Sequence, residues 1–365
     1  MSTAATRSAI KRASQQARNA MQQLDKDTIA ALQEIYSSAA EAVRDAIRAR
    51  VDSTDTVPVG QLRELLHQIE DVIDRLAVER DQLLQQSLVE AATLGVRPYT
   101  AAGVAATGRA GQAVLDTGAA MRVHEVAVRF VQTFQAADGL SLSERIWRLD
   151  KGAKEALTRS IGQAVVSGWD AARAARSYMT SGQMVPFDVA QRLKFSKADQ
   201  LVNGADLLLG KGGEVWKAER VMRTEINRAH GTAYMAGAEK TPGFGGFRFL
   251  LSPMHPKPDI CDLLASQNLY GLGEGVYPDA KTCPWPAHPN TLSFVELVFA
   301  DEVSDADRAG KETVTDAMAR MRPEVRQGVL GVEKSDLYDA GQVKPWMIRS
   351  PLYAVKQRLA RTGNA

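Results

Sequence analysis

The chain has 365 residues, of which 45% are hydrophobic and 24% charged, a balance typical of a globular protein with room for two or three domains. Its net charge of +2 is well below that of a strongly basic nucleic-acid-binding protein, and its two cysteines exclude a disulfide-rich secreted scaffold. Aromatic residues make up only 6% of the chain, whereas alanine, glutamine, arginine and glutamate are common, which favours long helices. No apolar segment reaches the roughly 20 residues of a membrane helix or resembles a secretory signal, so we expect a cytosolic protein with no membrane partner.

The first twenty residues are basic and contain no acidic side chain. The basic residues there are Arg7, Lys11, Arg12 and Arg18. Two interpretations are open. The segment could be an arm that touches nucleic acid or an acidic partner, or it could be a frayed, solvated terminus.

Residues from about 5 to 180 are predicted to be mostly helical. Asp27 and Thr28 have the side chains of an N-terminal cap, and apolar residues recur at helical spacing from Ile29 to Ile47. After a break at 53–58, a second stripe runs from Leu62 to Leu88. Such stripes usually pack against neighbouring helices of a bundle, although a stripe of this kind can also face a partner.

A further helix is predicted from Glu214 to Lys240, and after it the helical spacing of apolar residues ends. Two short strands are predicted, at Phe247–Leu251 and Ser293–Phe299, and a long irregular loop lies between them. The last sixty residues predict helices around Asp305–Met321, Pro323–Leu330, Lys334–Ala340 and Tyr353–Leu359. The expected fold is therefore mainly α with a small α+β domain: long N-terminal helices in 1–135, a compact domain with a small sheet in 136–300, and a helical C-terminal tail in 301–365.

The irregular loop gathers two of the five histidines and both cysteines, in the order His255, Cys261, Cys283, His288. Two thiolates and two imidazoles form a complete tetrahedral set for structural zinc, so these four are the candidate metal ligands. Asp259 and Asp262 could supply a carboxylate ligand or orient a histidine.

Other interpretations of the same residues remain open, because neither cysteine lies in a Cys-x2-Cys pair. Cys261 could be a small buried apolar residue while the histidines make hydrogen bonds. Cys261 and Cys283 could also form a disulfide. A cysteine and a histidine can make a nucleophile and base, but the sequence shows no third group to orient them and no His-Glu-x-x-His pair. We therefore expect no catalytic residues and no enzymatic activity.

The helix before the strands presents Arg223, Asn227 and His230 at positions i, i+4 and i+7, which share one face. This face could bind an acidic loop, for example through Asp259 or Asp262. It could equally be an ordinary solvated face.

Together with the two strands, this helix and this loop carry a family signature. It consists of Arg223-Thr-Glu225 with Asn227, then Asp259-x-Cys261-Asp, then His288-Pro289-Asn290. The series resembles the Mu F-like head-morphogenesis domain of minor capsid proteins in Mu-like and SPP1-like tailed phages. The match covers about residues 140–300. Family members often continue His-Pro-Asn with Cys-x-Cys, where this chain has Thr291 and Ser293.

The resemblance implies a minor head protein that acts in capsid assembly inside the procapsid, in the host cytoplasm and then in the virion. Its implied partners are the portal protein and the scaffold or major capsid protein, with phage DNA as a further candidate. The signature residues are then a framework that holds the loop to the helix. Two alternatives stay open: a virion DNA-binding or ejection-associated protein, and an enzyme, either a hydrolase or a toxin-like transferase, appended to a head domain.

Overall fold

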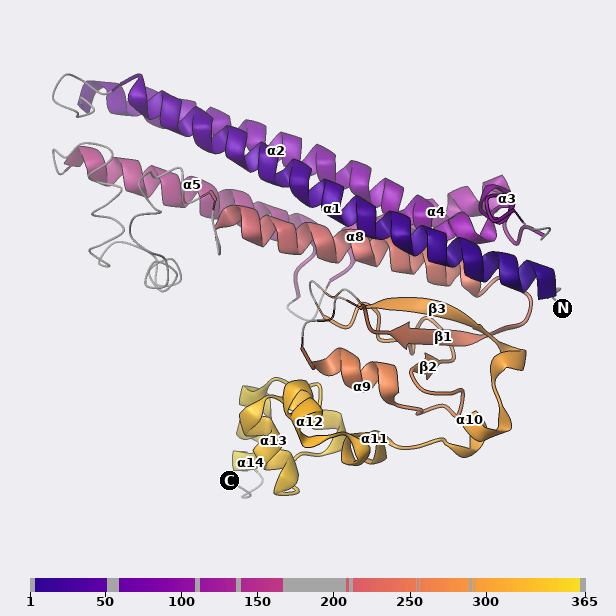
Figure 1. Ribbon diagram of the computed structural model, residues 1–365. Coiled ribbons are helices and arrows are strands. Elements are labelled where there is room, and N and C mark those ends of the chain that lie inside the picture. Colours follow the sequence, from indigo (N-terminus) through magenta and orange to yellow (C-terminus); the bar gives the residue numbers. More distant parts are fainter. Residues whose placement is uncertain are drawn as a thin grey trace. The chain divides into compact units, whose positions relative to one another are not determined.

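The structure is a computed structural model that describes residues 4–50, 59–108, 112–135, 139–166, 208–209, 213–253, 255, 257–288, 291 and 293–361. Its N-terminal elements are α1 (Ala4–Arg48), α2 (Val59–Val96), η1 (Arg97–Tyr99), α3 (Ala101–Ala105), α4 (Thr117–Thr133), α5 (Leu142–Val166) and α8 (Glu214–Ala238). The following ones are β1 (Phe244–Leu250), α9 (Ile260–Ser266), β2 (Val276–Tyr277), β3 (Phe294–Phe299), η4 (Ala300–Glu302), α10 (Asp305–Ala309), α11 (Val314–Arg320), α12 (Pro323–Leu330), α13 (Val332–Asp339), η5 (Pro345–Met347) and α14 (Leu352–Arg361). The described residues are mostly helical with one small sheet, which confirms the predicted fold class (Figure 1).

The chain divides into two compact units, each assembled from segments that are distant in sequence. Unit 1 comprises Met1–Met21, Ala91–Ala127 and Asn227–Ala365, and unit 2 comprises Gln22–Glu90 and Val128–Ile226. Helices α1, α2, α4 and α8 each contribute residues to both units. From sequence we expected domains that follow one another along the chain, with boundaries at 135 and 300. That division stays a prediction.

Unit 2 buries the apolar stripes that the sequence placed on its helices. Leu32 and Tyr36 on α1 are almost fully buried, as are Leu65, Ile69 and Ile73 on α2. These side chains therefore form an internal core of unit 2, which is the usual use of a helical stripe.

The predicted helix start at Asp27–Thr28 is wrong, because α1 begins at Ala4 and passes through these residues. Thr28 is buried, and its hydroxyl lies 3.1 Å from the hydroxyl of Ser87 on α2. A threonine that caps a helix and a threonine that hydrogen-bonds between two packed helices look the same in sequence. Upstream of Asp27, Met21 and Leu24 are buried apolar residues that continue the stripe.

The four basic residues among the first twenty all have partners within unit 1. Three of them form ion pairs, namely Arg7–Asp301, Lys11–Glu302 and Arg18–Glu296, the last at 3.1 Å. Arg12 donates to the main-chain oxygen of Thr107 at 3.2 Å. The frayed-terminus interpretation is therefore wrong for residues 4–20, which form a helix whose cations meet acidic groups of the same chain.

The sheet of unit 1 has the order β2–β1–β3, and both pairings are antiparallel (Figure 1). Phe247 pairs with Leu297, and Phe249 with Val295, so the buried side chains of β1 and β3 face the same layer. The two predicted strands are confirmed at β1 and β3. The two-residue strand β2 was not predicted, because it is too short for period-2 alternation to show.

The C-terminal tail packs as a helical cluster against α9. Leu263 of α9 shares a core with Met318 of α11, Leu330 of α12 and Val355 of α14. At Gly328 of α12 the backbone approaches the loop so closely that a Cβ would lie 2.5 Å from the main-chain oxygen of Pro258. The tail therefore supports the segment that leads into α9.

One helix predicted in the tail, Asp305–Met321, is wrong as a single helix. It is two helices, α10 and α11, separated by residues 310–313. Ser304 and Thr313 cap their starts, each with an aspartate three residues later that completes a capping box. Both boxes are visible in the sequence, and they outweigh the apolar periodicity across them.

None of the helices in the described ranges combines the length and the apolar character that a membrane span would require.

Candidate functional site

The loop between β1 and β3 is organised by the start of α9. Asp259 is the N-cap, and its Oδ1 accepts the N–H of Cys261 at 2.7 Å. Oδ2 of Asp262 accepts the N–H of Asp259 at 2.8 Å, which completes a capping box. A cap of this kind stabilises a helix by about 1 kcal/mol, and here it also fixes two carboxylates in place.

Around these carboxylates lie the two histidines of the loop. Nε2 of His288 is 3.2 Å from Sγ of Cys261 and 3.2 Å from Oδ2 of Asp259. The donor atoms of Asp259, Cys261 and His288, here called the Asp–Cys–His cluster, all lie within 4.8 Å of one another. On the other side of Asp259, Nε2 of His255 is 2.9 Å from Oδ2 of Asp262 and 3.9 Å from Oδ1 of Asp259.

Three of the four candidate ligands from sequence thus gather around Asp259, and the fourth does not. Among the described residues, Cys283 belongs to neither group of mutually close donor atoms, and both cysteine thiols are free and buried. Burial raises the pKa of Cys283 to about 12. Sequence spacing could not separate the two cysteines, because the path of the 21 residues between them cannot be read from the sequence. Pro289 and Asn290 lie outside the described residues.

The electrostatics of Cys261 do not suit a nucleophile. Burial raises the pKa of its thiol to about 11, and nearby Asp259 acts in the same direction, although hydrogen bonds from Ser293 and Thr291 oppose the shift. A thiol in this state is protonated at neutral pH and reacts poorly. In a catalytic triad, the nucleophile and the orienting carboxylate bind different ring nitrogens of the histidine. Here Cys261 and Asp259 both lie at Nε2 of His288.

The signature residues of α8 divide between two sets of contacts. Arg223 pairs with Asp25 through Nε at 3.0 Å, and Glu225, only 1% exposed, pairs with Arg145 at 3.1 Å. Both pairs lie within unit 2. The acidic side chain that Arg223 meets in the described residues is therefore Asp25 of α1, rather than Asp259 or Asp262 of the loop.

Asn227 is the signature residue of α8 that reaches the loop. Its Nδ2 donates to the main-chain oxygen of Thr291 at 2.9 Å, next to the segment that contains His288. Thr291 is buried, and its hydroxyl lies 3.7 Å from Sγ of Cys261. This hydrogen bond thus joins α8 to the segment that lies beside the Asp–Cys–His cluster.

Sequence reasoning missed Trp285, which fixes the same loop to α8. Its indole lies on Gly231, where a Cβ would be 1.9 Å from the ring nitrogen. The ring also makes an edge contact with Phe249 of β1, with centroids 6.0 Å apart. A lone glycine inside a helix is the sequence signal for such a close approach, and Gly231 carried that signal.

Replacing Gly231 with alanine should therefore destabilise unit 1 and displace Trp285. Overpacking costs about 1–3 kcal/mol, against a gain of up to about 1 kcal/mol from the better helix propensity of alanine. We expect a net loss in the free energy of unfolding by denaturant and a changed tryptophan fluorescence spectrum. Gly152→Ala in α5 is the matched control, because its Cβ would lie 3.6 Å from Glu214 and should stabilise. Equal stabilisation by both variants would contradict the packing of Trp285 on α8.

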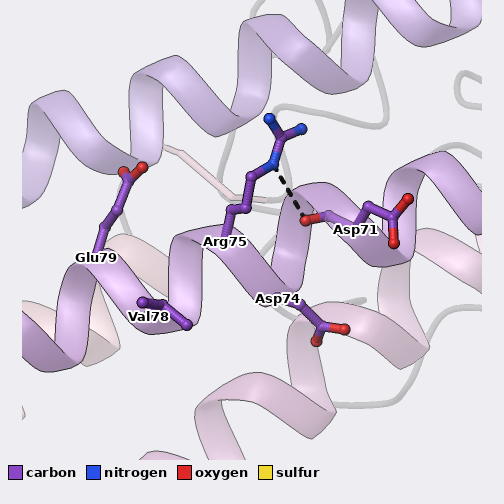
Figure 2. Close-up of a pocket in the computed structure, with 5 residues that line it drawn as sticks. All are labelled: Asp71, Asp74, Arg75, Val78 and Glu79. Carbon is purple, nitrogen blue, oxygen red and sulfur yellow. Dashed lines mark hydrogen bonds between the residues drawn. The ribbon is translucent and has the colours of Figure 1, made fainter.

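A hollow on α2 has no comparable chemistry. Figure 2 shows its lining residues, Asp71, Asp74, Arg75, Val78 and Glu79, all from one helix. Nε of Arg75 donates to the main-chain oxygen of Asp71 at 3.4 Å. No cysteine or histidine lines this hollow, so the Asp–Cys–His cluster remains the better candidate site.

No protein-family model, no curated protein and no solved structure matches this chain. What the protein does is therefore inferred from the Asp–Cys–His cluster, from its attachment to α8 and from the sequence signature that these residues carry.

Proposed function

We propose that this chain is a minor head protein of a tailed bacteriophage that acts in capsid assembly, associated with the portal inside the procapsid. Its role is structural rather than catalytic. It would be made in the host cytoplasm and remain in the virion interior, with the portal protein and the scaffold or major capsid protein as partners.

The hydrogen bond from Asn227 to Thr291 is the observation that carries this proposal. The signature lies in segments more than sixty residues apart, namely the α8 helix and the loop before β3. A signature that arose by chance would give no reason for these segments to meet. Here Asn227 binds the loop directly, and Cys261, Asp259 and His288 lie in contact with one another. The contacts support a framework that holds the loop to the helix.

Of the two alternatives, the DNA-binding protein has the weaker support. In sequence, this alternative is based on the basic N-terminal segment. In the structure, Arg7, Lys11 and Arg18 of that segment pair with acidic residues of the same chain. Charge-driven DNA binding falls steeply as salt rises, so a binding curve at low and high salt tests this alternative directly.

The enzyme alternative is disfavoured by the contacts of His288. Cys261 and Asp259 share one ring nitrogen, and the Cys261 thiol has a raised pKa. Neither property suits a nucleophile activated by a base. An activity that Cys261→Ser abolishes would revive this alternative.

Replacing Asn227 with alanine tests the proposed function. The change leaves a buried carbonyl of Thr291 without its donor, which costs about 1–3 kcal/mol, or on the order of tenfold or more in the equilibrium ratio of attached to detached loop. In a phage whose own copy of the gene is disabled, we expect this variant to yield correspondingly fewer DNA-filled heads. The yield is counted by electron microscopy and by infectious titre.

Asn19→Ala is the matched control, because Asn19 is exposed on α1 and its side chain accepts only a local hydrogen bond from Gln15. This variant should complement fully. Mass spectrometry of purified particles should also find the chain in the virion. Particles that lack the chain, or full heads in normal number when the gene is disabled, would refute a role in head assembly.

A further inference from the structure

The Asp–Cys–His cluster brings three different donor atoms to one point: a sulfur, a ring nitrogen and a carboxylate oxygen. Zinc binds these atoms at about 2.0–2.3 Å in a tetrahedron, which places neighbouring donors roughly 3.3–3.6 Å apart. The Cys261–His288 and His288–Asp259 distances are both 3.2 Å. These two pairs are therefore within a few tenths of an ångström of the spacing that a bound zinc would impose, and the third pair, Cys261 and Asp259, lies within 4.8 Å.

One ring nitrogen of His288 faces both other groups, and a single proton cannot serve them equally. If Nε2 of His288 carries the proton, it donates to Asp259, and the thiol of Cys261 is left to donate to the hydroxyl of Thr291 at the long distance of 3.7 Å. If Nε2 is unprotonated, it accepts from the thiol, and the carboxylate of Asp259 then faces a lone pair. A cation at the point where the three atoms converge would bind all of them at once.

The identity of the donors favours zinc over harder cations. Magnesium and calcium take oxygen ligands, whereas thiolate and imidazole together suit zinc. The cluster also has neighbours of the kind that orient metal ligands. The hydroxyl of Thr291 is 3.7 Å from Sγ of Cys261, and Asp259 is held in place as the N-cap of α9.

We propose that Asp259, Cys261 and His288 bind one zinc ion, with the fourth position open to water or to a partner side chain. Cys283, the fourth ligand suggested by the sequence, is not part of the site. His255 is a positioning residue, because it contacts Asp262 and lies 3.9 Å from Asp259. The ion would join the start of α9 to a segment 27 residues later in the chain and so close the loop in the way that Asn227 does.

This site does not depend on the proposed role in the phage head. Its test uses purified full-length protein and metal ions alone, whereas the proposed function is tested by particle yield, so the failure of one does not imply the failure of the other.

The first experiment requires no variant. The chain is incubated with zinc, freed of unbound metal and analysed for metal content, and we expect about one zinc per chain. Cobalt in place of zinc should give the absorption bands of a tetrahedral site together with a sulfur-to-cobalt charge-transfer band. Well-folded protein with much less than one zinc, or cobalt bound without the charge-transfer band, would overturn the proposal.

Matched cysteine variants then assign the sulfur. Cys261→Ser should lose the charge-transfer band, and Cys283→Ser should retain it. The opposite result would overturn the ligand set. Because Cys261→Ser could also unfold the protein, Thr291→Cys gives a gain in place of a loss: a second thiol beside Cys261 should strengthen the band and tighten cobalt binding. An unchanged band in folded Thr291→Cys protein would count against the site.

His255→Gln should weaken zinc binding about 10- to 100-fold, the usual effect of removing a group that orients a ligand.

Discussion

Replacing Asp150 with alanine should lower the free energy of unfolding by about 3 kcal/mol, the lower end of the range for breaking a buried ion pair. Asp150 accepts from Nη1 of Arg80 at 2.6 Å, and the Arg80 side chain is only 3% exposed. Burial opposes the charged form of Arg80 and is the largest single effect, but the hydrogen bonds that Arg80 donates to Asp150 and Asp81, together with nearby negative charge, keep the pKa of Arg80 above its ordinary value. The loss stays near the lower end because Asp81 still accepts from Arg80 at 2.7 Å. Denaturant unfolding monitored by circular dichroism measures the change.

An exposed ion pair between the same two helices is the matched control. Lys154 of α5 pairs with Asp74 of α2, with side chains 39% and 63% exposed. Asp74→Ala should cost no more than about 1 kcal/mol, because water solvates both charges when the pair is broken. If Asp150→Ala and Asp74→Ala cost the same, then Arg80 is not buried between α2 and α5 as the structure describes.

The stability of unit 1 should fall as the pH falls, through His230. Burial, and then the charge of Arg18, lower the pKa of His230 to about 4. The unfolded chain binds this proton near pH 6.5, whereas the native chain binds it only near pH 4. The contribution of His230 is therefore complete above pH 6.5 and is lost as the pH falls towards 4. From about pH 7 to about pH 4.5 we expect a loss of about 2 kcal/mol from this residue.

His230→Leu should remove this contribution. Nε2 of His230 is buried without a hydrogen-bond partner, so an apolar side chain of similar volume leaves no group newly unsatisfied. We expect the stability at pH 7 to change by less than about 1.5 kcal/mol and the decline towards pH 4.5 to be shallower than in the wild type. His67→Leu is the control, because its side chain is 78% exposed and its loss should leave the pH profile unchanged. Parallel wild-type and His230→Leu profiles would show that His230 is solvated in the folded protein.

The zinc site and the Asn227 contact would act on the same loop by different means. Asn227 joins α8 to Thr291, and the Asp–Cys–His cluster joins α9 to His288. A loop held at both places would present one fixed surface to a partner. If the chain works in the phage head as proposed, zinc removal and Asn227→Ala should reduce particle yield in the same direction.

The sequence by itself determined several of the regular elements. The stripe on α2 predicted a buried face, and Leu65, Ile69 and Ile73 are buried. The strands at β1 and β3 and the helix α8 lie where they were predicted. Such features depend on periodicity within one segment, and periodicity can be read from the sequence alone. Errors arose where one residue type serves two purposes, as at Thr28, which hydrogen-bonds to Ser87 and does not cap a helix.

Only the tertiary structure decided which of the loop residues meet. The sequence brought His255, Cys261, Cys283 and His288 into one candidate set. The structure groups Cys261 and His288 with Asp259, places His255 beside Asp262 and leaves Cys283 outside both groups. It also pairs Arg223 with Asp25 and shows that Asn227 binds Thr291 of the loop. The physical reason is common to these cases. The partner of a side chain in an irregular loop depends on the path of the chain between distant segments, and spacing along the sequence does not record that path.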